Sequence, residues 1–249
     1  MLLIPATLVP ADANGDRIGE ARALCHLGLA EYCQGRYQQS AEWHRRALAI
    51  YLEAGVRAGQ ARELHALGVV DLRQGRPEQA AEQLRRSLAL FREGGFRSGE
   101  AHVLSNLGEL ELLQGRYAQA ADHLRRSLEL GRETGSRLGQ AQTLAWLGIC
   151  ELRQGLGRQA IGHLRQSLAL HSQVGNRSGQ AEALNGLGEA LLAAGQVGQA
   201  SAWHAAALAL AIQCGDKREQ TRACGGLASA RQATGDNGQA RNEWQTFVR

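Results

Sequence analysis

The chain has 249 residues, of which 44% are hydrophobic and 21% are charged. This apolar content is enough for a continuous core, so it excludes a disordered chain. The net charge of +4 is too small, over this length, to favour nucleic acid as a partner.

Residues 1–14 form an N-terminal extension ahead of the patterned part of the chain. Leu8 stands in register with Leu48 further along, and Pro5 and Pro10 interrupt the segment. We interpret the extension as the remnant of a preceding helix. It lacks the basic start of a signal peptide, and no apolar run in the chain is long enough to span a membrane.

From residue 15 onwards, two sets of glycines recur with a spacing of 40 residues. The sets are Gly15, Gly55, Gly95, Gly135, Gly175, Gly215 and Gly35, Gly75, Gly115, Gly155, Gly195, Gly235. Constant spacing indicates one structural unit copied six times. The predicted repeats are 16–55, 56–95, 96–135, 136–175, 176–215 and 216–249, and we expect them to form one elongated domain, 15–249.

Each repeat contains two segments whose apolar residues have helical spacing, here called helix A and helix B. In the first repeat, helix A carries Ala21, Leu24, Leu27, Gly28 and Tyr32 on one face. Helix B carries Ser40, Ala41, His44, Ala47 and Leu48 on one face. The sequence therefore predicts an all-α protein of about twelve helices.

The predicted helix ends have local chemical causes. The recurring glycines follow the helices, where the chain adopts a left-handed conformation that glycine reaches without a Cβ penalty. Pro77 falls in the first turn of a helix B, where its missing N–H costs little. The residues that can cap helix A by accepting hydrogen bonds from its free amides are Asp16, Ser136, Asn176 and Asp216.

Two further sets of glycines lie inside helix A. They are Gly28, Gly68, Gly108, Gly148, Gly188 and Gly19, Gly59, Gly99, Gly139, Gly179. Each such glycine costs roughly 1 kcal/mol relative to alanine, so their repetition predicts close helix crossings. The expected small partners are Ala80, Ala120, Ala160 and Ala200.

A carboxylate recurs near the middle of the apolar face of helix A, where it needs a partner. We call the equivalent position in successive repeats a column. In repeats one to six this column has Glu31, Asp71, Glu111, Glu151, Leu191 and Arg231. The column five residues later has Arg36, Arg76, Arg116, Leu156, Gln196 and Asp236. We expect an ion pair across the turn between helix A and helix B in repeats one, two, three and six. The alternative is a coincidence among solvated turn charges.

The pattern resembles the tetratricopeptide repeat. The residues that carry the resemblance are Leu27, Gly28, Gly35, Tyr37, Tyr117, Leu48 and the small residues at 40 and 47. The 40-residue unit resembles a variant of bacterial signalling ATPases, actinobacterial transcriptional regulators and animal polarity adaptors. The resemblance covers residues 15–249. It implies a right-handed superhelix, an α-solenoid whose concave groove is lined by helix A.

The sequence contains no catalytic motif that would indicate an enzyme, and none that requires a cofactor. His123 and His163 share one column, and we interpret them as surface histidines and not as a metal site. The five cysteines contain no C-x-x-C pair. This pattern disfavours a disulfide framework or a zinc knuckle and favours a reducing cytoplasm.

Arginine pairs such as Arg85–Arg86 and Arg125–Arg126 recur along helix B. One interpretation is a basic surface that binds phosphates in RNA or at a membrane. We favour a solvated outer face, because Glu82 stands three and four residues before its arginines, the spacing of ion pairs on a helix surface. Neither nucleic acid nor a membrane is therefore expected as a partner.

The expected binding surface is the exposed face of helix A, at positions 22, 25, 26, 29 and 33 and their equivalents. Residues there vary between repeats, which indicates either drift on a solvated surface or recognition of an extended peptide or partner helix. Trp146 favours recognition, since a groove-facing indole is a candidate anchor. The candidate partner-binding residues are Arg22, His26, Arg62, His65, His102, Asn106, Gln142, Trp146, Glu182, Asn185 and Arg222.

Three functions follow from these features. The first is a scaffold that binds a peptide or protein in the groove, as a sensor or regulatory arm of a bacterial signalling or transcriptional protein. The second is self-association into a homo-oligomer through the chain ends, which have no polar capping helix and suggest a piece of a longer chain. An RNA-binding helical repeat is disfavoured, because the repeats show no base-reading code.

Overall fold

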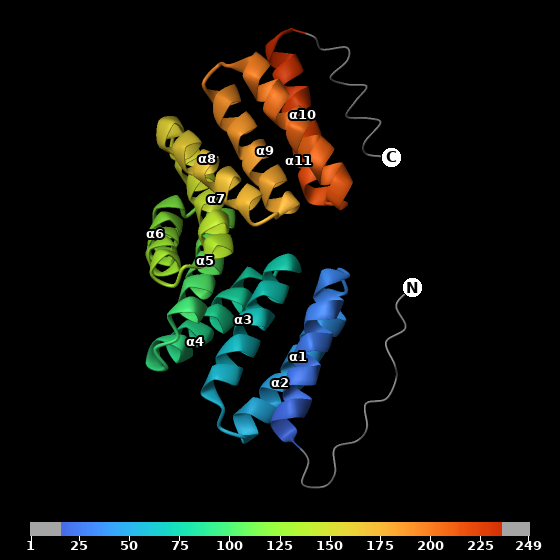
Figure 1. Cartoon of the computed structure of the whole chain (residues 1–249), viewed down its shortest axis with the longest axis vertical. Helices are drawn as coiled ribbons and strands as arrows, with labels where there is room; N and C mark the ends of the chain where they lie inside the picture. Colours follow the sequence, from blue (N-terminus) through green and yellow to red (C-terminus); the bar gives the residue numbers. More distant parts are fainter. Residues whose placement is uncertain (1–15, 236–249) are drawn as a thin grey trace. The chain divides into compact units, whose positions relative to one another are not determined.

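The computed structural model describes residues 16–235, and within that range the chain forms eleven α-helices and no strand (Figure 1). The helices are α1 (Arg17–Cys33), α2 (Tyr37–Glu53), α3 (Arg57–Arg73), α4 (Pro77–Glu93), α5 (Arg97–Leu113), α6 (Tyr117–Glu133), α7 (Arg137–Arg153), α8 (Gly157–Gln173), α9 (Arg177–Ala193), α10 (Val197–Cys214) and α11 (Lys217–Ala233). Odd-numbered helices are the predicted helices A and even-numbered ones the predicted helices B. The predicted twelfth helix and the extension 1–14 lie outside the described residues.

The chain divides into two compact units after Gly99. In the first unit α1 packs on α2, α2 on α3 and α3 on α4. In the second unit α6 to α11 likewise pack in sequence order, and α7 contacts α9, as α9 contacts α11. Neighbouring helices A therefore touch one another in the second unit. A single domain of six repeats and its right-handed superhelix stay predictions.

The turns between helices use glycine in the left-handed conformation. All eleven turn glycines from Gly35 to Gly235 have positive φ, between 67° and 85°. In the first turn the Gly35 N–H donates to the Tyr32 carbonyl and the Arg36 N–H donates to the Glu31 carbonyl, each at 2.9 Å. This is a Schellman motif, which brings the residue after the glycine beside the third residue from the helix end.

That geometry accounts for the predicted ion pairs across the turns. Arg36 pairs with Glu31, Arg116 pairs with Glu111, and Arg76 lies 2.7 Å from Asp71. The prediction is confirmed in repeats one, two and three, while the pair of repeat six includes a residue outside the described range. The hydrogen bond from Arg36 holds the pKa of Glu31 below its ordinary value.

In the fourth repeat, a histidine takes the place of arginine as the partner of the recurring carboxylate. Leu156 stands where the arginine would be, yet Glu151 is buried. The imidazole Nδ1 of His163, on α8, lies 2.7 Å from the Glu151 carboxylate. His163 is therefore a partner of a buried carboxylate.

The predicted caps of helix A are confirmed. The side chains of Asp16, Ser136, Asn176 and Asp216 each accept a hydrogen bond from an amide three residues later. Pro77 occupies the first turn of α4, as predicted. These contacts satisfy backbone donors that a helix start otherwise leaves free.

The glycines inside helix A mark places where two helices cross closely. A Cβ built on Gly148 would lie 2.7 Å from Cγ of Leu164 and 3.1 Å from the carbonyl oxygen of Ala160. Leu84 and Leu124 stand in the same way against Gly68 and Gly108. The predicted crossings are confirmed, but the side chain that fills each one is this leucine.

The identity of the predicted small partners needs a correction. Ala80, Ala120 and Ala160 approach the glycines through their carbonyl oxygens, and Ala200 is not among the atoms nearest to Gly188. At Gly28 and Gly188 the imidazoles of His44 and His204 take the place of the leucine, 2.6 Å from the position of a Cβ. The larger side chain reaches the glycine because the missing Cβ leaves room for it.

Rings also fill the space left by three glycines of the second set and so join successive repeats. Tyr51 packs against Gly59, Phe91 against Gly99, and His171 against Gly179. His171 is fully buried, and neither of its ring nitrogens has a hydrogen-bond partner among the described residues. Burial lowers the pKa of His171 to about 4 from its ordinary 6.5.

Replacement of His171 by phenylalanine, the residue of the equivalent position 91, is expected to reduce the acid sensitivity of the fold. Between pH 6.5 and about 4 the unfolded chain binds a proton at His171 and the folded chain does not, so the folded state loses stability as the pH falls through this window. The loss amounts to up to about 3 kcal/mol. His171→Phe is expected to lack this component when urea denaturation is compared at about pH 7.5 and pH 4.5.

The comparison of the two proteins cancels the contributions of other titratable groups. These include the carboxylates and two further histidines, His102 and His204, whose pKa values burial lowers. An equal loss of stability in His171→Phe and in the parent chain would show that the buried imidazole does not disfavour protonation.

Candidate functional site

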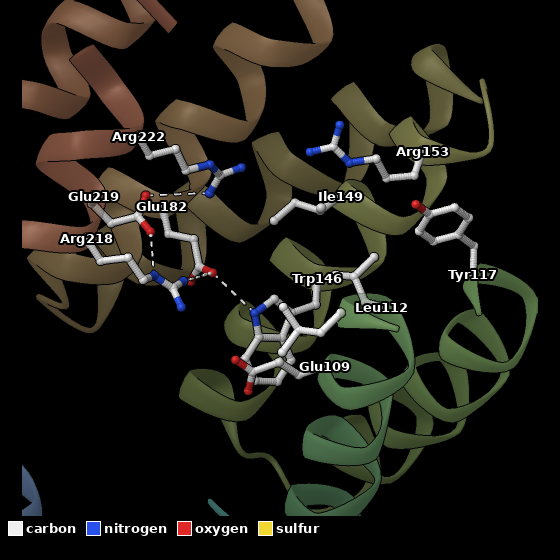
Figure 2. Close-up of a pocket in the computed structure, with 11 residues that line it drawn as sticks. Glu109, Leu112, Tyr117, Trp146, Ile149, Arg153, Glu182, Arg218, Glu219 and Arg222 are labelled. Atoms are coloured by element: carbon white, nitrogen blue, oxygen red, sulfur yellow. Dashed lines mark hydrogen bonds and ion pairs between the residues drawn. The ribbon is translucent and has the colours of Figure 1, made fainter. Parts of the chain in front are cut away.

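The second unit contains a cavity of about 340 Å³ on the side of its helices A. Its lining comes from α5, α7, α9 and α11, with one residue, Tyr117, from the start of α6. Figure 2 shows these side chains converging from the two sides of the cavity. Because successive helices A touch one another in this unit, side chains of residues far apart in sequence meet there.

One part of the lining is apolar. It is made of Leu112, Leu113, Tyr117, Trp146 and Ile149. Leu113, the last residue of α5, is 68% exposed, which is the largest exposure among the large hydrophobic side chains described. An exposed leucine beside partly buried apolar neighbours is a surface that a ligand's side chain can cover.

The opposite part of the lining is a network of ion pairs. The Arg218 guanidinium lies 3.2 Å from both Glu182 and Glu219. The Arg222 guanidinium lies 2.7 Å from Glu189 and 3.5 Å from Glu219. The indole N–H of Trp146 donates to Glu182 at 3.2 Å, which ties the apolar part to the charged part (Figure 2).

The carboxylates lie beneath the guanidinium groups. The side chains of Glu182 and Glu219 are 8% and 2% exposed, whereas that of Arg218 is 61% exposed. Burial acts to lower the pKa of Arg222, but the hydrogen bond and charge of Glu189 outweigh it, so the pKa lies above its ordinary value. Arg222 is therefore charged at neutral pH. The exposed guanidinium of Arg218 belongs to the part of the network that a ligand meets first.

The structure brings three of the predicted partner-binding residues, Trp146, Glu182 and Arg222, to this cavity. Gln142 lies next to them, since its amide donates to Glu182 at 2.7 Å. Partner binding by any of the candidate residues stays a prediction, and the others do not line the cavity. Four of them lie in the first unit, at 22, 26, 62 and 65, and His102 and Asn106 lie on α5.

The expectation that these positions are exposed is wrong at three of them. Trp146, Glu182 and Asn185 are buried. The side chain of Asn185 donates to the carboxylate of Glu219 and its oxygen faces His204, both at 3.0 Å. Contacts between neighbouring helices A cover these positions, which an isolated helix would leave open.

The sequence interpretation missed several residues of the site, chiefly Arg153, Arg218 and Glu219. A signal for Glu219 was present, because it stands where the preceding five repeats have glycine. Its carboxylate then enters space that those repeats leave to a ring or a cap. Arg153 is the equivalent of position 33 on the predicted binding face, although it was not among the candidate residues. Arg218 had no such signal, since the residue at its position varies between repeats.

The arginine pairs of helix B are exposed, as predicted. Arg125 lies 3.2 Å from Asp122, and Arg126 lies 2.9 Å from Glu129. Within residues 16–235, every helix is too short or too polar to cross a membrane.

Comparison with protein families gives a match to the tetratricopeptide repeat over residues 19–93, 60–133, 99–173 and 139–213. The chain belongs to the tetratricopeptide-repeat family. A tetratricopeptide-repeat array is a scaffold for protein–protein interaction, and the matched residues extend over most of this chain. Comparison with curated proteins finds no match.

Solved structures with a similar fold include the following three. A Rap protein complexed with competence and sporulation factor has a TM-score of 0.74 at 13% identity, over 92% of this chain and 70% of that chain. Aspartyl phosphate phosphatase F from Bacillus subtilis has a TM-score of 0.72 at 14% identity, over 93% and 59%. A STAND protein with a tetratricopeptide repeat sensor from Pyrococcus horikoshii has 0.67 at 13%, over 95% and 37%. This tetratricopeptide-repeat chain therefore spans only part of the phosphatase and the STAND protein.

Truncation of Glu219 to alanine is expected to destabilise the fold by about 1 to 3 kcal/mol, because it removes a buried carboxylate that Arg218, Arg222 and Asn185 share. Arg222 keeps its pair with Glu189, and Asn185 keeps the backbone carbonyl of residue 219. Glu129→Ala, which breaks an exposed pair with Arg126, serves as the control and is expected to cost less than about 1 kcal/mol. Urea denaturation followed by circular dichroism measures both. Equal, small effects would contradict a structural role for the network.

Proposed function

We propose that this chain binds a peptide, or an extended segment of a partner protein, in the cavity of its second unit. The observation that carries the proposal is the composition of the lining, in which an exposed leucine and its partly buried apolar neighbours lie near exposed guanidinium groups. Ligand sites commonly combine an apolar surface with a few polar groups that fix orientation.

The charges favour a ligand that carries a carboxylate. Arg153 and Arg218 are more than half exposed, whereas the carboxylates of Glu182 and Glu219 are covered. Arg153 lies 3.9 Å from Glu189, a long contact that leaves its guanidinium able to reach a ligand. Planar guanidinium groups bind carboxylates through two parallel hydrogen bonds. An acidic side chain or a chain terminus would lie toward the arginines, and an apolar side chain toward Leu113 and Ile149.

The finer role we propose is that of a sensor or regulatory arm in a bacterial signalling or transcriptional protein, acting by recognition and not by catalysis. Similar folds in a Rap protein complexed with competence and sporulation factor and in the sensor of a STAND protein support it. Because both proteins are only 13% identical to this chain, the similarity is evidence for the fold alone. Self-association through the chain ends stays a prediction, because those ends lie outside the described residues.

Selection from a random peptide library against the full chain tests the proposal. Leu113→Asp and Arg153→Glu are expected to weaken the selected peptides at least tenfold, or about 1.4 kcal/mol. Ile212→Asp is the matched control, because Ile212 is an exposed apolar residue of α10 that does not line the cavity. It is expected to leave the affinity unchanged.

Light scattering of each variant shows whether a change in oligomeric state accounts for a change in affinity. Failure to select any peptide, or peptides that bind the two cavity variants as tightly as the parent chain, would contradict the proposal.

A further inference from the structure

Three side chains that are good metal ligands meet inside the first unit, away from the cavity. Cys25 lies on α1, His44 on α2 and Glu63 on α3. One ligand atom from each lies within 4.8 Å of the other two. Nδ1 of His44 is 2.7 Å from a carboxylate oxygen of Glu63. The three helices pack side by side in the blue-to-cyan part of Figure 1.

The repeat itself does not require this chemistry. Leucines 84, 124 and 164 occupy the column of His44, and Val103 and Ala183 occupy the column of Glu63. Apolar side chains build the same helical hairpins where Leu84 and Val103, or Leu164 and Ala183, stand at these positions. Only 1% of Glu63 is exposed, and a buried carboxylate costs stability unless charged or hydrogen-bonding partners compensate it. The cluster therefore places polar side chains where other repeats have apolar ones, at a cost in stability.

We propose that Cys25, His44 and Glu63 form a binding site for a zinc ion. Thiolate, imidazole and carboxylate are the three donors that Zn²⁺ takes in proteins, at bond lengths of about 2.0 to 2.3 Å. Such bonds place the donor atoms roughly 3 to 4 Å apart in a tetrahedron. Nδ1 of His44 and the Glu63 oxygen, 2.7 Å apart, must therefore move slightly apart, whereas separations of up to 4.8 Å must close slightly. Three protein ligands leave a fourth position for water or an external ligand.

Binding replaces hydrogen bonds by metal bonds and releases one proton. In the metal-free protein, burial, then the charge and hydrogen bond of Glu63, raise the pKa of the Cys25 thiol to about 12. The ion displaces the thiol proton to solvent. The ring proton that Nδ1 of His44 donates to Glu63 in the metal-free protein moves to Nε2, which leaves Nδ1 as a ligand. Tyr51, Arg22 and Arg62 are the other charged or titratable groups that act on the cluster. Metal affinity therefore increases with pH.

Titration of the metal-free full chain with Co²⁺, a coloured substitute for Zn²⁺, tests the site. The expected result is a charge-transfer band from one thiolate to cobalt that saturates at one ion per chain and disappears when Zn²⁺ is added. Cys25→Ser is expected to abolish the band. Cys33→Ser, which changes an exposed cysteine of the same helix, is the matched control and is expected to keep it.

His44→Leu and Glu63→Val introduce the residues of the equivalent positions in other repeats, so these variants are expected to fold, as circular dichroism checks. Each is expected to lower the Co²⁺ affinity by more than the roughly 10- to 100-fold that loss of an outer-shell partner costs. The absence of a band in the parent chain, or a band that persists in Cys25→Ser, would overturn the proposal. Either result would identify the cluster as hydrogen-bonded polar groups only.

Discussion

In the first five repeats the backbone of helix A comes so close to helix B that no Cβ fits at the crossing. Gly68, Gly108 and Gly148 each receive a leucine from the following helix, and Gly28 and Gly188 each receive a histidine. A glycine inside a helix weakens that helix, so the packing it permits must more than offset this loss. The turn glycines and the caps then set where each helix ends, and the repeat of 40 residues follows from both.

Buried polar and charged side chains occur in this scaffold where one repeat has a different residue from the other repeats at the same position. His44 and Glu63 replace apolar residues and meet Cys25. Glu219 replaces a glycine and binds Arg218, Arg222 and Asn185. The regular columns explain the fold, whereas the departures from them explain the cavity and the polar cluster.

The sequence predicted the helical hairpins, their caps and three ion pairs, because these depend on residues within one repeat. Glu31 and Arg36, for example, are adjacent through the geometry of a single turn. It did not predict that Trp146 and Asn185 are buried or that Arg153 faces Arg222 across a cavity. Those facts depend on how closely neighbouring helices A approach, which periodicity in one helix does not specify.

The most direct measurement is the stability of Gly148→Ala compared with that of Gly162→Ala. Both glycines lie inside helices of the second unit, but a Cβ at Gly162 meets no atom within 4 Å. Gly162→Ala is expected to stabilise the fold by about 0.5 to 1 kcal/mol, and Gly148→Ala to destabilise it by about 1 to 3 kcal/mol. Stabilisation of equal size by both substitutions would contradict the close crossing on which the account rests.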